Sequence, residues 1–296
     1  MTSPSISVIV IVYDGASFLD EAIMSVRGQT CQDYELLIVD DGSTDDSLAI
    51  AERHRLAHPH RIRVLRHPGG VNRGMSASRN LGIAHAQGDF VAFLDADDVW
   101  LPRKLEEQVA ILRAEPSCGL VYGRALIWRS WRTARAEDDF YYDLGVEPGR
   151  MYAAPQLFLR QLRNVDQTPT TSGAMLRRSL ITQVGGFEDV FRGMFEDQVF
   201  FAKALLAAPA YVSDATWFRY RQHPASATAR SAAAGADHLW RMRYLRWLAE
   251  RLAEFPGADL QRAAVRAEMR QARRSHARRR ALQIVRRLRR PWRASR

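Results

Sequence analysis

A chain of 296 residues, 47% of them hydrophobic, can bury one core of roughly 200 residues and still carry an appendage. Its two cysteines, Cys31 and Cys118, exclude a disulfide-rich small domain, so we expect a reducing compartment, although the two could form one bridge. The charge is uneven: residues 230–296 hold 19 Lys and Arg against 5 Asp and Glu, whereas residues 1–229 carry a net charge of −4.

Neither a secretory signal nor a membrane span is predicted. Residues 1–5 lack a basic start and an apolar run, and no stretch approaches the roughly 18 uninterrupted apolar residues that a membrane span needs. We therefore expect a cytoplasmic protein, which could also lie peripherally at the inner face of the plasma membrane.

The first hundred residues alternate between apolar runs of strand length and helical patterns. The apolar runs, rich in β-branched residues, predict four strands, at residues 6–13, 34–39, 61–65 and 90–94. The helical patterns predict three helices, at residues 16–28, from a cap at Ser43 or Asp45 to Leu56, and at 76–86. This alternation predicts a mostly parallel sheet covered by helices, in which ligands bind at the carboxyl ends of the strands.

Beyond Trp100 the pattern is looser. It predicts helices at residues 102–114 and 195–208, strands at 119–128 and 168–177, and a polar loop region at 129–149. A further helix at 237–254 is indicated by apolar residues at three- and four-residue steps, namely Leu239, Met242, Leu245, Leu248 and Leu252.

A second amphipathic stretch lies close to the C-terminus. Its apolar face holds Ala281, Val285, Leu288 and Trp292, and arginines surround that face: Arg279, Arg280, Arg286, Arg287, Arg289 and Arg290. A basic helix of this kind could lie on an anionic membrane surface. A helical hairpin packed on the main domain, a contact with a partner protein and a disordered basic tail are the alternatives. The arginines come without a nucleic-acid-binding motif, so we expect no nucleic acid partner.

Two carboxylates, Asp95 and Asp97, follow the predicted strand at 90–94 directly. Mg²⁺ and Mn²⁺ prefer carboxylate and phosphate oxygens, and Mg²⁺ commonly takes one or two carboxylates together with substrate phosphates. A metal held there would neutralise a pyrophosphate and make it a better leaving group. The alternative is a solvated acidic turn.

Other residues could also carry chemistry. Asp41, at the end of the second strand, could bind a nucleobase edge or a ribose hydroxyl, or cap a helix. Arg79, after a glycine-rich loop at 69–74, could pair with a diphosphate, or be an ordinary surface arginine. One of Glu196 and Asp197, in the first turn of a helix, could act as a general base, or merely complement the helix dipole.

A lone histidine, His223, lies beside a turn just before the basic C-terminal segment that begins at residue 230. It could bind a metal or contact phosphate, whereas the alternative is a surface or packing role.

Together these segments resemble the inverting glycosyltransferases of family 2, which have the GT-A fold. The resemblance covers about residues 5–228 and rests on an ordered series of motifs: VDDGSTD at 39–45, GMSASRN at 74–80, GD at 88–89, FLDADDVWLP at 93–102, GGF at 185–187, ED at 196–197 and YRQH at 220–223. No QxxRW motif is present, which favours transfer of a single sugar over processive polymerisation.

The resemblance implies an α/β fold, a Rossmann-like GT-A sheet that is mostly parallel and flanked by helices. It implies a catalytic domain at residues 1–228, with a nucleotide-binding half at 1–100 and an acceptor-binding half at 101–228. Residues 229–296 would form a basic amphipathic helical extension.

Roles for the donor site follow from the same resemblance. Tyr13 would lie against the nucleoside base, Asp41 would bind the base, and Arg79 would contact the diphosphate. Ile11 stands where many members carry proline or threonine, and Asp14 where asparagine is usual.

Metal binding and catalysis are implied for the remaining positions. Asp95 and Asp97 would be the DxD acids, and Asp97 would be the principal ligand of Mn²⁺ or Mg²⁺. His223 would close over the metal and phosphates, and Asp197 would be the catalytic base.

The implied reaction moves one sugar from a nucleoside diphosphate sugar, with UDP favoured, to a glycan or lipid-linked acceptor in the synthesis of cell-surface polysaccharide or lipid-linked glycan. Two other classes remain open. A sugar-phosphate nucleotidyltransferase should carry a basic, glycine-rich loop after the first strand, but residues 14–17 contain no Lys or Arg. A catalytically weak nucleotide-sugar-binding interaction protein is disfavoured by intact Asp41, Asp97 and Asp197.

Overall fold

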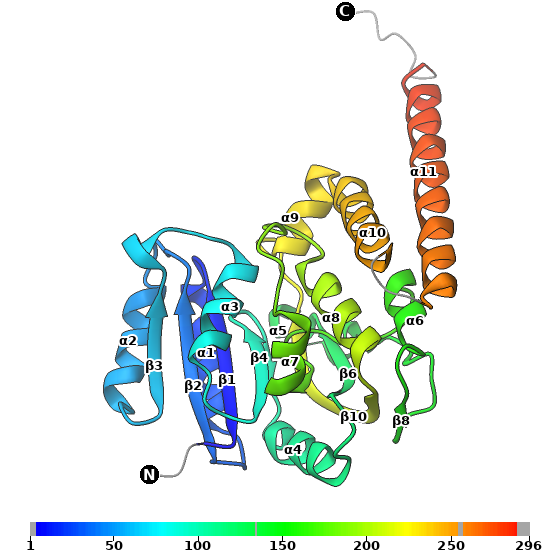
Figure 1. Cartoon of the computed structure of the whole chain (residues 1–296). Helices are drawn as coiled ribbons and strands as arrows, with labels where there is room; N and C mark the ends of the chain where they lie inside the picture. The colour runs from blue at the N-terminus through cyan, green and yellow to red at the C-terminus, as the bar shows by residue number, and fades with distance from the viewer. Residues whose placement is uncertain (1–3, 134, 254–256, 289–296) are drawn as a thin grey trace, which may run out of the picture. The chain divides into compact units, whose positions relative to one another are not determined.

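The computed structural model describes residues 4–133, 135–253 and 257–288, and within these ranges it leaves the side chains of residues 136 and 279–288 undescribed. By its internal contacts the chain divides into two compact units, Met1–Ala229 and Arg230–Arg296. The first unit is a sheet with helices on both faces (Figure 1). Within the described residues, no helix combines the length and apolar character needed to cross a membrane.

One sheet contains all the strands of the described residues. They are β1 (Ile6–Val12), β2 (Tyr34–Asp40), β3 (Ile62–Arg66), β4 (Phe90–Asp95), β5 (Val99–Trp100), β6 (Leu120–Trp128), β7 (Phe140–Tyr141), β8 (Arg150–Tyr152), β9 (Met175–Arg177) and β10 (Ala210–Arg221). Their order is β3-β2-β1-β4-β9-β6-β10-β5, with β7 beside β6 and β8 beside β10. The first four strands of this order are parallel, β9 is antiparallel to both of its neighbours, and β6 and β10 are parallel.

The helices of the first unit are α1 (Ala16–Arg27), α2 (Ser47–Ala57), α3 (Met75–His85), α4 (Lys104–Ala114), α5 (Ser130–Thr133), α6 (Phe158–Arg163), α7 (Arg178–Val184) and α8 (Glu196–Ala207). Two 3-10 turns lie at η1 (Pro68–Gly70) and η2 (Ala136–Asp138). Helix α9 (Ala227–Ala234) spans the boundary between the units, and α10 (Asp237–Ala253) and α11 (Asp259–Leu288) follow in the second unit.

The sheet is buried on both faces, which explains the uninterrupted apolar sequence of β1. On one face Val8 and Val10 share a buried cluster with residues of α1, α2 and α4. On the other face Ile9 and Ile11 share a cluster with residues of α7 and α8. Each buried aliphatic side chain contributes roughly 1.5–3 kcal/mol relative to exposure, so this alternation stabilises both layers around the strand.

Helix α2 begins later than predicted, at Ser47, and neither Ser43 nor Asp45 is its N-cap residue. The Ser43 Oγ accepts a hydrogen bond from the backbone N–H of Asp14 at 3.1 Å, and the Asp45 Oδ2 accepts one from the N–H of Ala16 at 2.9 Å. Ser43 therefore ties the segment after β2 to the residues before α1. Asp45 contacts both helices, because its Oδ1 also accepts a hydrogen bond from the N–H of Ser47, the first residue of α2, at 3.0 Å.

The strand predicted at residues 168–177 is wrong for most of its length. Only Met175–Arg177 is strand, and the preceding residues form a turn. Threonine favours strands because its side chain is branched at Cβ, but its hydroxyl can also bond to neighbouring polar groups. Here the hydroxyl of Thr171 donates to Asp95, and that of Ser172 donates to Asp98. The loop region predicted at 129–149 likewise contains short elements, among them α5 and β7.

The second unit contains α10 and α11 packed against each other. Of the predicted apolar stripe on α10, Met242, Leu245, Leu248 and Leu252 are buried, but Leu239 is 70% exposed. His238, one residue earlier, stacks on His276 of α11 at 3.9 Å, and successive helical residues point about 100° apart, so Leu239 faces away. Trp292, Arg289 and Arg290 lie outside the described residues, as do the side chains of Arg279, Arg280, Ala281, Val285, Arg286, Arg287 and Leu288.

Candidate active site

Strands β1, β2 and β4 bring polar residues to the same edge of the sheet. Val12 pairs with Asp40 and Ile11 pairs with Asp95, so the three parallel strands end in register. Ligands of open α/β sheets bind at this edge, outside the carboxyl ends of the strands. The residues that follow these strands are therefore gathered where a donor would bind.

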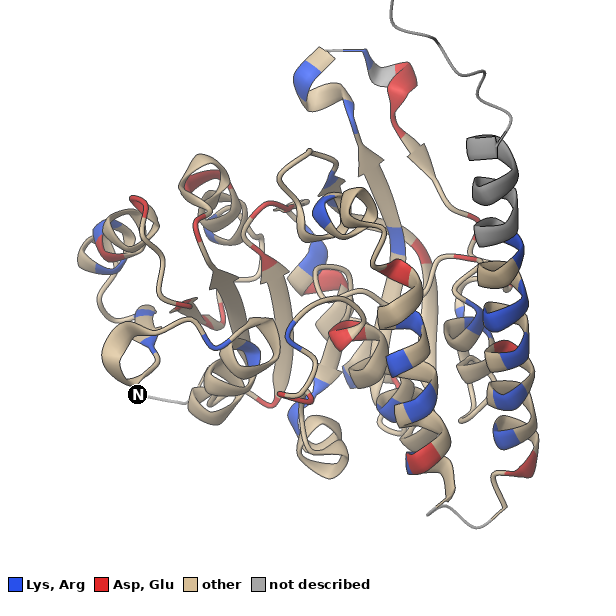
Figure 2. Cartoon of the chain, turned by 90° about the horizontal axis from the view of Figure 1, so that it is seen from above, with Lys and Arg blue, Asp and Glu red and all other residues tan. Residues whose placement is uncertain are grey.

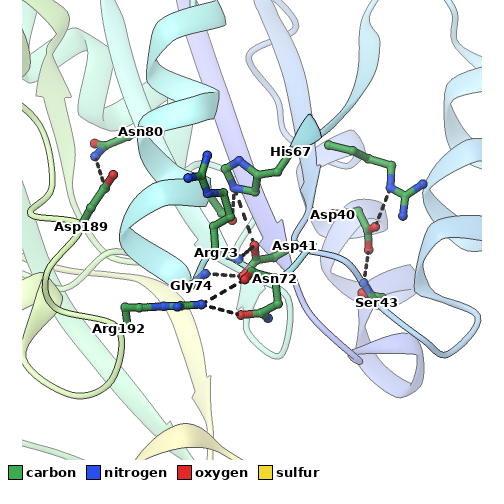
Figure 3. A network of polar contacts seen from close by, with 12 residues as sticks. Asp40, Asp41, Ser43, His67, Asn72, Arg73, Gly74, Asn80, Asp189 and Arg192 are labelled. Atoms are coloured by element: carbon green, nitrogen blue, oxygen red, sulfur yellow. Dashed lines mark hydrogen bonds and ion pairs between the residues drawn. The ribbon is translucent and has the colours of Figure 1, made fainter. Parts of the chain in front are cut away.

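Asp41 organises the loop that precedes α3 (Figure 3). Its Oδ1 accepts a hydrogen bond from the N–H of Arg73 at 2.7 Å, and its Oδ2 accepts one from the N–H of Gly74 at 2.8 Å. His67 Nε2 lies 3.6 Å from Oδ1 and 3.1 Å from the hydroxyl of Ser78. The carboxylate is buried and fixed in orientation. Its contact with a nucleobase stays a prediction.

Gly42 allows the same loop to approach the end of β2. Its φ of +78° suits glycine, and an added Cβ would lie 2.6 Å from the carbonyl oxygen of Gly70 and 2.9 Å from the nitrogen of Asn72. Arg192 holds the loop from another side, because its Nη2 donates to the Asn72 carbonyl at 3.0 Å (Figure 3). The loop at 70–74 is therefore held by segments far apart in the chain.

Tyr13 and Asp14 follow β1 at the same edge. Tyr13 is 48% exposed, which leaves its ring accessible to a flat ligand. Asp14 Oδ1 accepts hydrogen bonds from the N–H of Thr44 at 2.7 Å and from its hydroxyl at 3.1 Å. The side-chain oxygen of asparagine, which the resemblance leads us to expect at this position, can accept the same two bonds. Asp14 therefore preserves a contact between the two loops.

Arg79 is buried beneath the site and is not a surface arginine. Its Nη2 donates to Asp95 Oδ1 at 2.7 Å, its Nη1 donates to Glu196 Oε1 at 3.0 Å, and its Cζ lies 5.2 Å from the ring centroid of Phe187. Burial alone would lower the pKa of the guanidinium, but the two carboxylates raise it above its ordinary value. Both terminal nitrogens already bond to acids, and its contact with a diphosphate stays a prediction.

Glu196 and Asp197 open α8, as expected from the sequence. Phe195, just before them, has a φ of +72°, a rare backbone conformation for a bulky residue. Burial, and then the charge of Asp197, raise the pKa of Glu196 to about 7 against the opposing effect of Arg79. Burial likewise raises the pKa of Asp197, with Arg79 opposing it and Asp95 adding to it. The pKa of Asp197 therefore depends on the charge of Asp95.

Asp95, the last residue of β4, and Asp97, two residues later, are partly exposed acids, with side chains 29% and 32% exposed. Besides Arg79, Asp95 accepts a hydrogen bond at Oδ2 from the hydroxyl of Thr171 at 2.9 Å. Asp97 Oδ2 lies 2.9 Å from Nε2 of His223. The structure therefore brings His223 to one of the acids that the sequence predicts as metal ligands.

Asp98 has a different environment. Its Oδ2 accepts a hydrogen bond from the hydroxyl of Ser172 at 2.6 Å, and its Oδ1 accepts one from the N–H of Arg221 at 3.0 Å. Burial, and then the charges of Asp97 and Asp95, raise the pKa of Asp98 well above its ordinary value. Asp98 is therefore buried, and its two hydrogen bonds connect the loop after β4 to Ser172 and Arg221.

The residues around Asp97 fit a cation that is shared with a diphosphate. Asp97 and His223 could hold it, with Asp95 nearby, but no group of three or more His, Cys, Asp or Glu residues with the geometry of a metal site occurs in the part of the chain that the structure describes. Mg²⁺ usually keeps waters and is bound through one or two carboxylates plus substrate phosphates. Such a site needs no complete protein cage.

The residues Thr171, Ser172, Asp98 and Arg221 contact this site, although the sequence analysis assigned none of them a role. Asp98 and Arg221 lie within two of the motifs that carry the resemblance. The hydroxyl-rich run TPTTSG at 168–173 was the available signal for the first two. A hollow of about 480 Å³ lies elsewhere, between α1 and α2, and is lined by none of the predicted site residues.

Comparison with known proteins shows extensive similarity in sequence. Residues 7–185 match the family model of glycosyl transferase family 2. An uncharacterized glycosyltransferase of Nostoc sp. is 33% identical over 179 residues, which cover 60% of this chain and 52% of that protein. The O-antigen biosynthesis protein RfbC of Myxococcus xanthus is 31% identical over 235 residues, which cover 79% of this chain and 17% of that protein. The chain thus spans about half the length of the first relative and less of the second.

Solved structures share the fold. TarS of S. aureus, residues 1–349 in complex with UDP-GlcNAc, matches with a TM-score of 0.68 and 21% identity over 91% of this chain and 72% of that chain. A mannosyltransferase of Pyrobaculum calidifontis, in complex with GDP-Man and Mn²⁺, matches with a TM-score of 0.59 and 19% identity over 90% of this chain and 70% of that chain. The predicted α/β sheet with flanking helices is therefore confirmed. The family match extends over more than half of the residues, and the chain belongs to glycosyl transferase family 2.

Proposed function

We propose that this glycosyltransferase moves one sugar from a nucleoside diphosphate sugar to an acceptor hydroxyl and inverts the anomeric centre. The observation that carries the proposal is the buried guanidinium of Arg79, which bonds to Asp95 at 2.7 Å and to Glu196 at 3.0 Å. One buried group thereby connects Asp95, at the end of β4, with the first turn of α8, which carries Asp197. A donor site and a general base on these two segments would act on the same sugar.

The donor would bind across the ends of β1, β2 and β4. Tyr13 would stack on the base, and Asp41, already oriented by two backbone N–H groups, would accept a hydrogen bond from it. UDP is the favoured nucleotide, because the TarS structure that shares this fold contains UDP-GlcNAc. The sugar itself would then lie toward Asp95 and Asp197.

Asp97 and His223 would hold Mn²⁺ or Mg²⁺, with Asp95 beside them. The cation would supply positive charge to the leaving diphosphate. We propose Mn²⁺ as one candidate for this cation, because one solved structure of similar fold contains Mn²⁺.

Asp197 would act as the general base. It would take the proton from the acceptor hydroxyl as the acceptor oxygen forms its bond to the anomeric carbon and the bond from that carbon to the diphosphate oxygen breaks. Burial raises the pKa of Asp197, which makes its carboxylate a stronger base than an exposed aspartate. Attack from the face opposite the leaving group inverts the anomeric centre in one step.

We propose a cell-surface polysaccharide or a lipid-linked glycan as the product, because the relative from Myxococcus xanthus is named for O-antigen biosynthesis. The second unit would serve such an acceptor at an anionic membrane. Figure 2 shows Lys and Arg recurring along α11, where Arg266, Arg270, Arg273, Arg274 and Arg278 are exposed. Arg270→Glu with Arg274→Glu should reduce sedimentation with vesicles that contain phosphatidylglycerol, and equal sedimentation of the variant and the unchanged protein would refute the membrane contact.

The reaction is tested with a panel of nucleoside diphosphate sugars and Mn²⁺, by following nucleotide release and sugar transfer. Asp197→Asn should abolish transfer and retain donor binding, and Asp97→Ala should weaken donor binding only when Mn²⁺ is present. Asp214→Asn is the matched control, because Asp214 is exposed and pairs with Arg124 away from these acids. Transfer by Asp197→Asn at the rate of the unchanged protein would refute the assignment of the base.

A further inference from the structure

Arg221, the last residue of β10, is buried within a cage of aromatic rings. Its Cζ lies 5.0 Å from the ring centroid of Phe18, 4.4 Å from that of Trp128 and 4.9 Å from that of Trp131. Phe18 comes from α1, whereas Trp128 and Trp131 come from the end of β6 and from α5, more than a hundred residues later. Cation–π contacts of this kind strengthen when the cation is removed from water, so the cage fixes the guanidinium in place.

The caged side chain is bonded to the segment that carries Asp97. Arg221 Nε donates to the Asp97 carbonyl oxygen at 2.8 Å, and the backbone N–H of Arg221 donates to Asp98 Oδ1 at 3.0 Å. Its Nη2 pairs with the carboxylate of Glu21 on α1. Arg221, at the end of β10, thus fixes the backbone of Asp97.

The same cage also holds the segment that carries His223. The ring of Phe18 lies 4.7 Å from the imidazole of His223, centroid to centroid. Trp131 Nε1 donates to the carbonyl oxygen of Gln222 at 3.0 Å, and the N–H of Gln222 donates to the carbonyl oxygen of Trp128 at 3.0 Å. Asp97 and His223, the two residues that could bind a cation, are therefore both held by Arg221 and its aromatic cage.

We propose that Arg221 is a positioning residue, which with the cage of Phe18, Trp128 and Trp131 presets Asp97 and His223 for a divalent cation shared with the donor diphosphate. This inference rests on the proposed function, in which these two residues hold the cation. Groups that are already in place lose less conformational freedom when the cation binds. Residues that orient metal ligands in this way typically change metal affinity by about 10- to 100-fold when they are replaced.

The test is binding of Mn²⁺ in the presence of UDP, followed by the electron paramagnetic resonance signal of free Mn²⁺. Arg221→Lys keeps a positive charge but loses the planar group that reaches Asp97, and we expect Mn²⁺ affinity to fall by about 10-fold or more. Trp131→Phe keeps an aromatic ring in the cage and loses the N–H that bonds to Gln222, so a smaller decrease is expected. Arg219→Lys is the matched control, because Arg219 is exposed on the same strand and touches Trp128 without contacting a site acid.

Steady-state kinetics provide a second readout. A positioning role predicts a higher KM for Mn²⁺ in Arg221→Lys and a kcat that largely recovers at saturating Mn²⁺. A folded Arg221→Lys with unchanged Mn²⁺ affinity and KM would overturn the inference and leave the proposed function intact. If Arg221→Lys does not fold, Trp131→Phe decides, and its unchanged Mn²⁺ affinity has the same meaning. Failure of the unchanged protein to bind Mn²⁺ with UDP would instead overturn the metal-dependent function, and the inference with it.

Discussion

Replacement of Glu196 by glutamine should remove a pH-dependent loss of stability. Glu196 is buried beside Arg79, and its pKa is raised from 4.5 to about 7, chiefly by burial. The unfolded chain releases this proton near pH 4.5, whereas the folded chain keeps it until about pH 7. The stabilising contribution of the protonated group is therefore complete below pH 4.5 and is lost as the pH rises through about 7.

The size of the effect follows from the two pKa values. Each pKa unit of difference corresponds to about 1.4 kcal/mol, so the free energy of unfolding should fall by on the order of 2 to 3 kcal/mol between pH 5 and pH 8 because of this group. Urea unfolding at several pH values, followed by tryptophan fluorescence, measures it. The difference in free energy of unfolding between the original chain and Glu196→Gln should decrease across this range.

Glu188→Gln is the control for this experiment. Glu188 also pairs with a residue of α8, accepting a hydrogen bond from Lys203 Nζ at 2.7 Å, but its side chain is 34% exposed. This variant should retain the pH dependence of the original chain. If the stability curves of the original chain and Glu196→Gln run parallel from pH 5 to pH 8, burial does not keep Glu196 protonated and the reasoning is wrong.

Three further outcomes are expected. Gly42→Ala should lower the free energy of unfolding by about 1–3 kcal/mol and weaken UDP binding, since φ is +78° and the new Cβ would meet the backbone at Gly70; an unchanged melting temperature would contradict this. Burial lowers the pKa of Lys104 well below 10.5, so the unfolded chain binds a proton that the folded chain lacks, and stability should rise with pH up to about 10.5. Urea unfolding of Lys104→Met should show a smaller rise, and an equal rise would refute the assignment. The kcat/KM of transfer should increase with pH through a pKa above the usual aspartate range, because the ionised form of Asp197 is required. A plot of kcat/KM against pH that is flat from pH 4 to 7, and that Asp197→Glu leaves unchanged, would contradict this expectation.

The parallel half of the sheet could be predicted from the sequence, because its signals are local. Strands β1 and β2 are buried on both faces and therefore appear as continuous apolar runs, and the acids that follow β2 and β4 mark the strand ends. Parallel pairing then brings Asp41 and Asp95 to one edge. These inferences need only the order of residues and the rules of strand pairing.

The second half of the sheet could not be predicted in the same way. The 12-residue strand β10 went unrecognised because polar residues and register shifts between Val212 and Phe218 interrupt its apolar alternation. The burial of Glu196 depends on Arg79, which lies 117 residues earlier in the chain. A long-range ion pair leaves no periodic signal, so its effect on the pKa of Glu196 emerges only from the folded structure.

The position of Arg79 has a consequence for recombination among related enzymes. Its two carboxylate partners are separated by about a hundred residues, and one lies on each side of residue 100. A chimera joined at residue 100 would inherit the guanidinium from one parent and the carboxylate at position 196 from the other. Exchange of the two halves would therefore succeed only between parents that match at both positions. A mismatched hybrid would leave Arg79 with Asp95 as its remaining carboxylate partner, or would bury Glu196 without a cation.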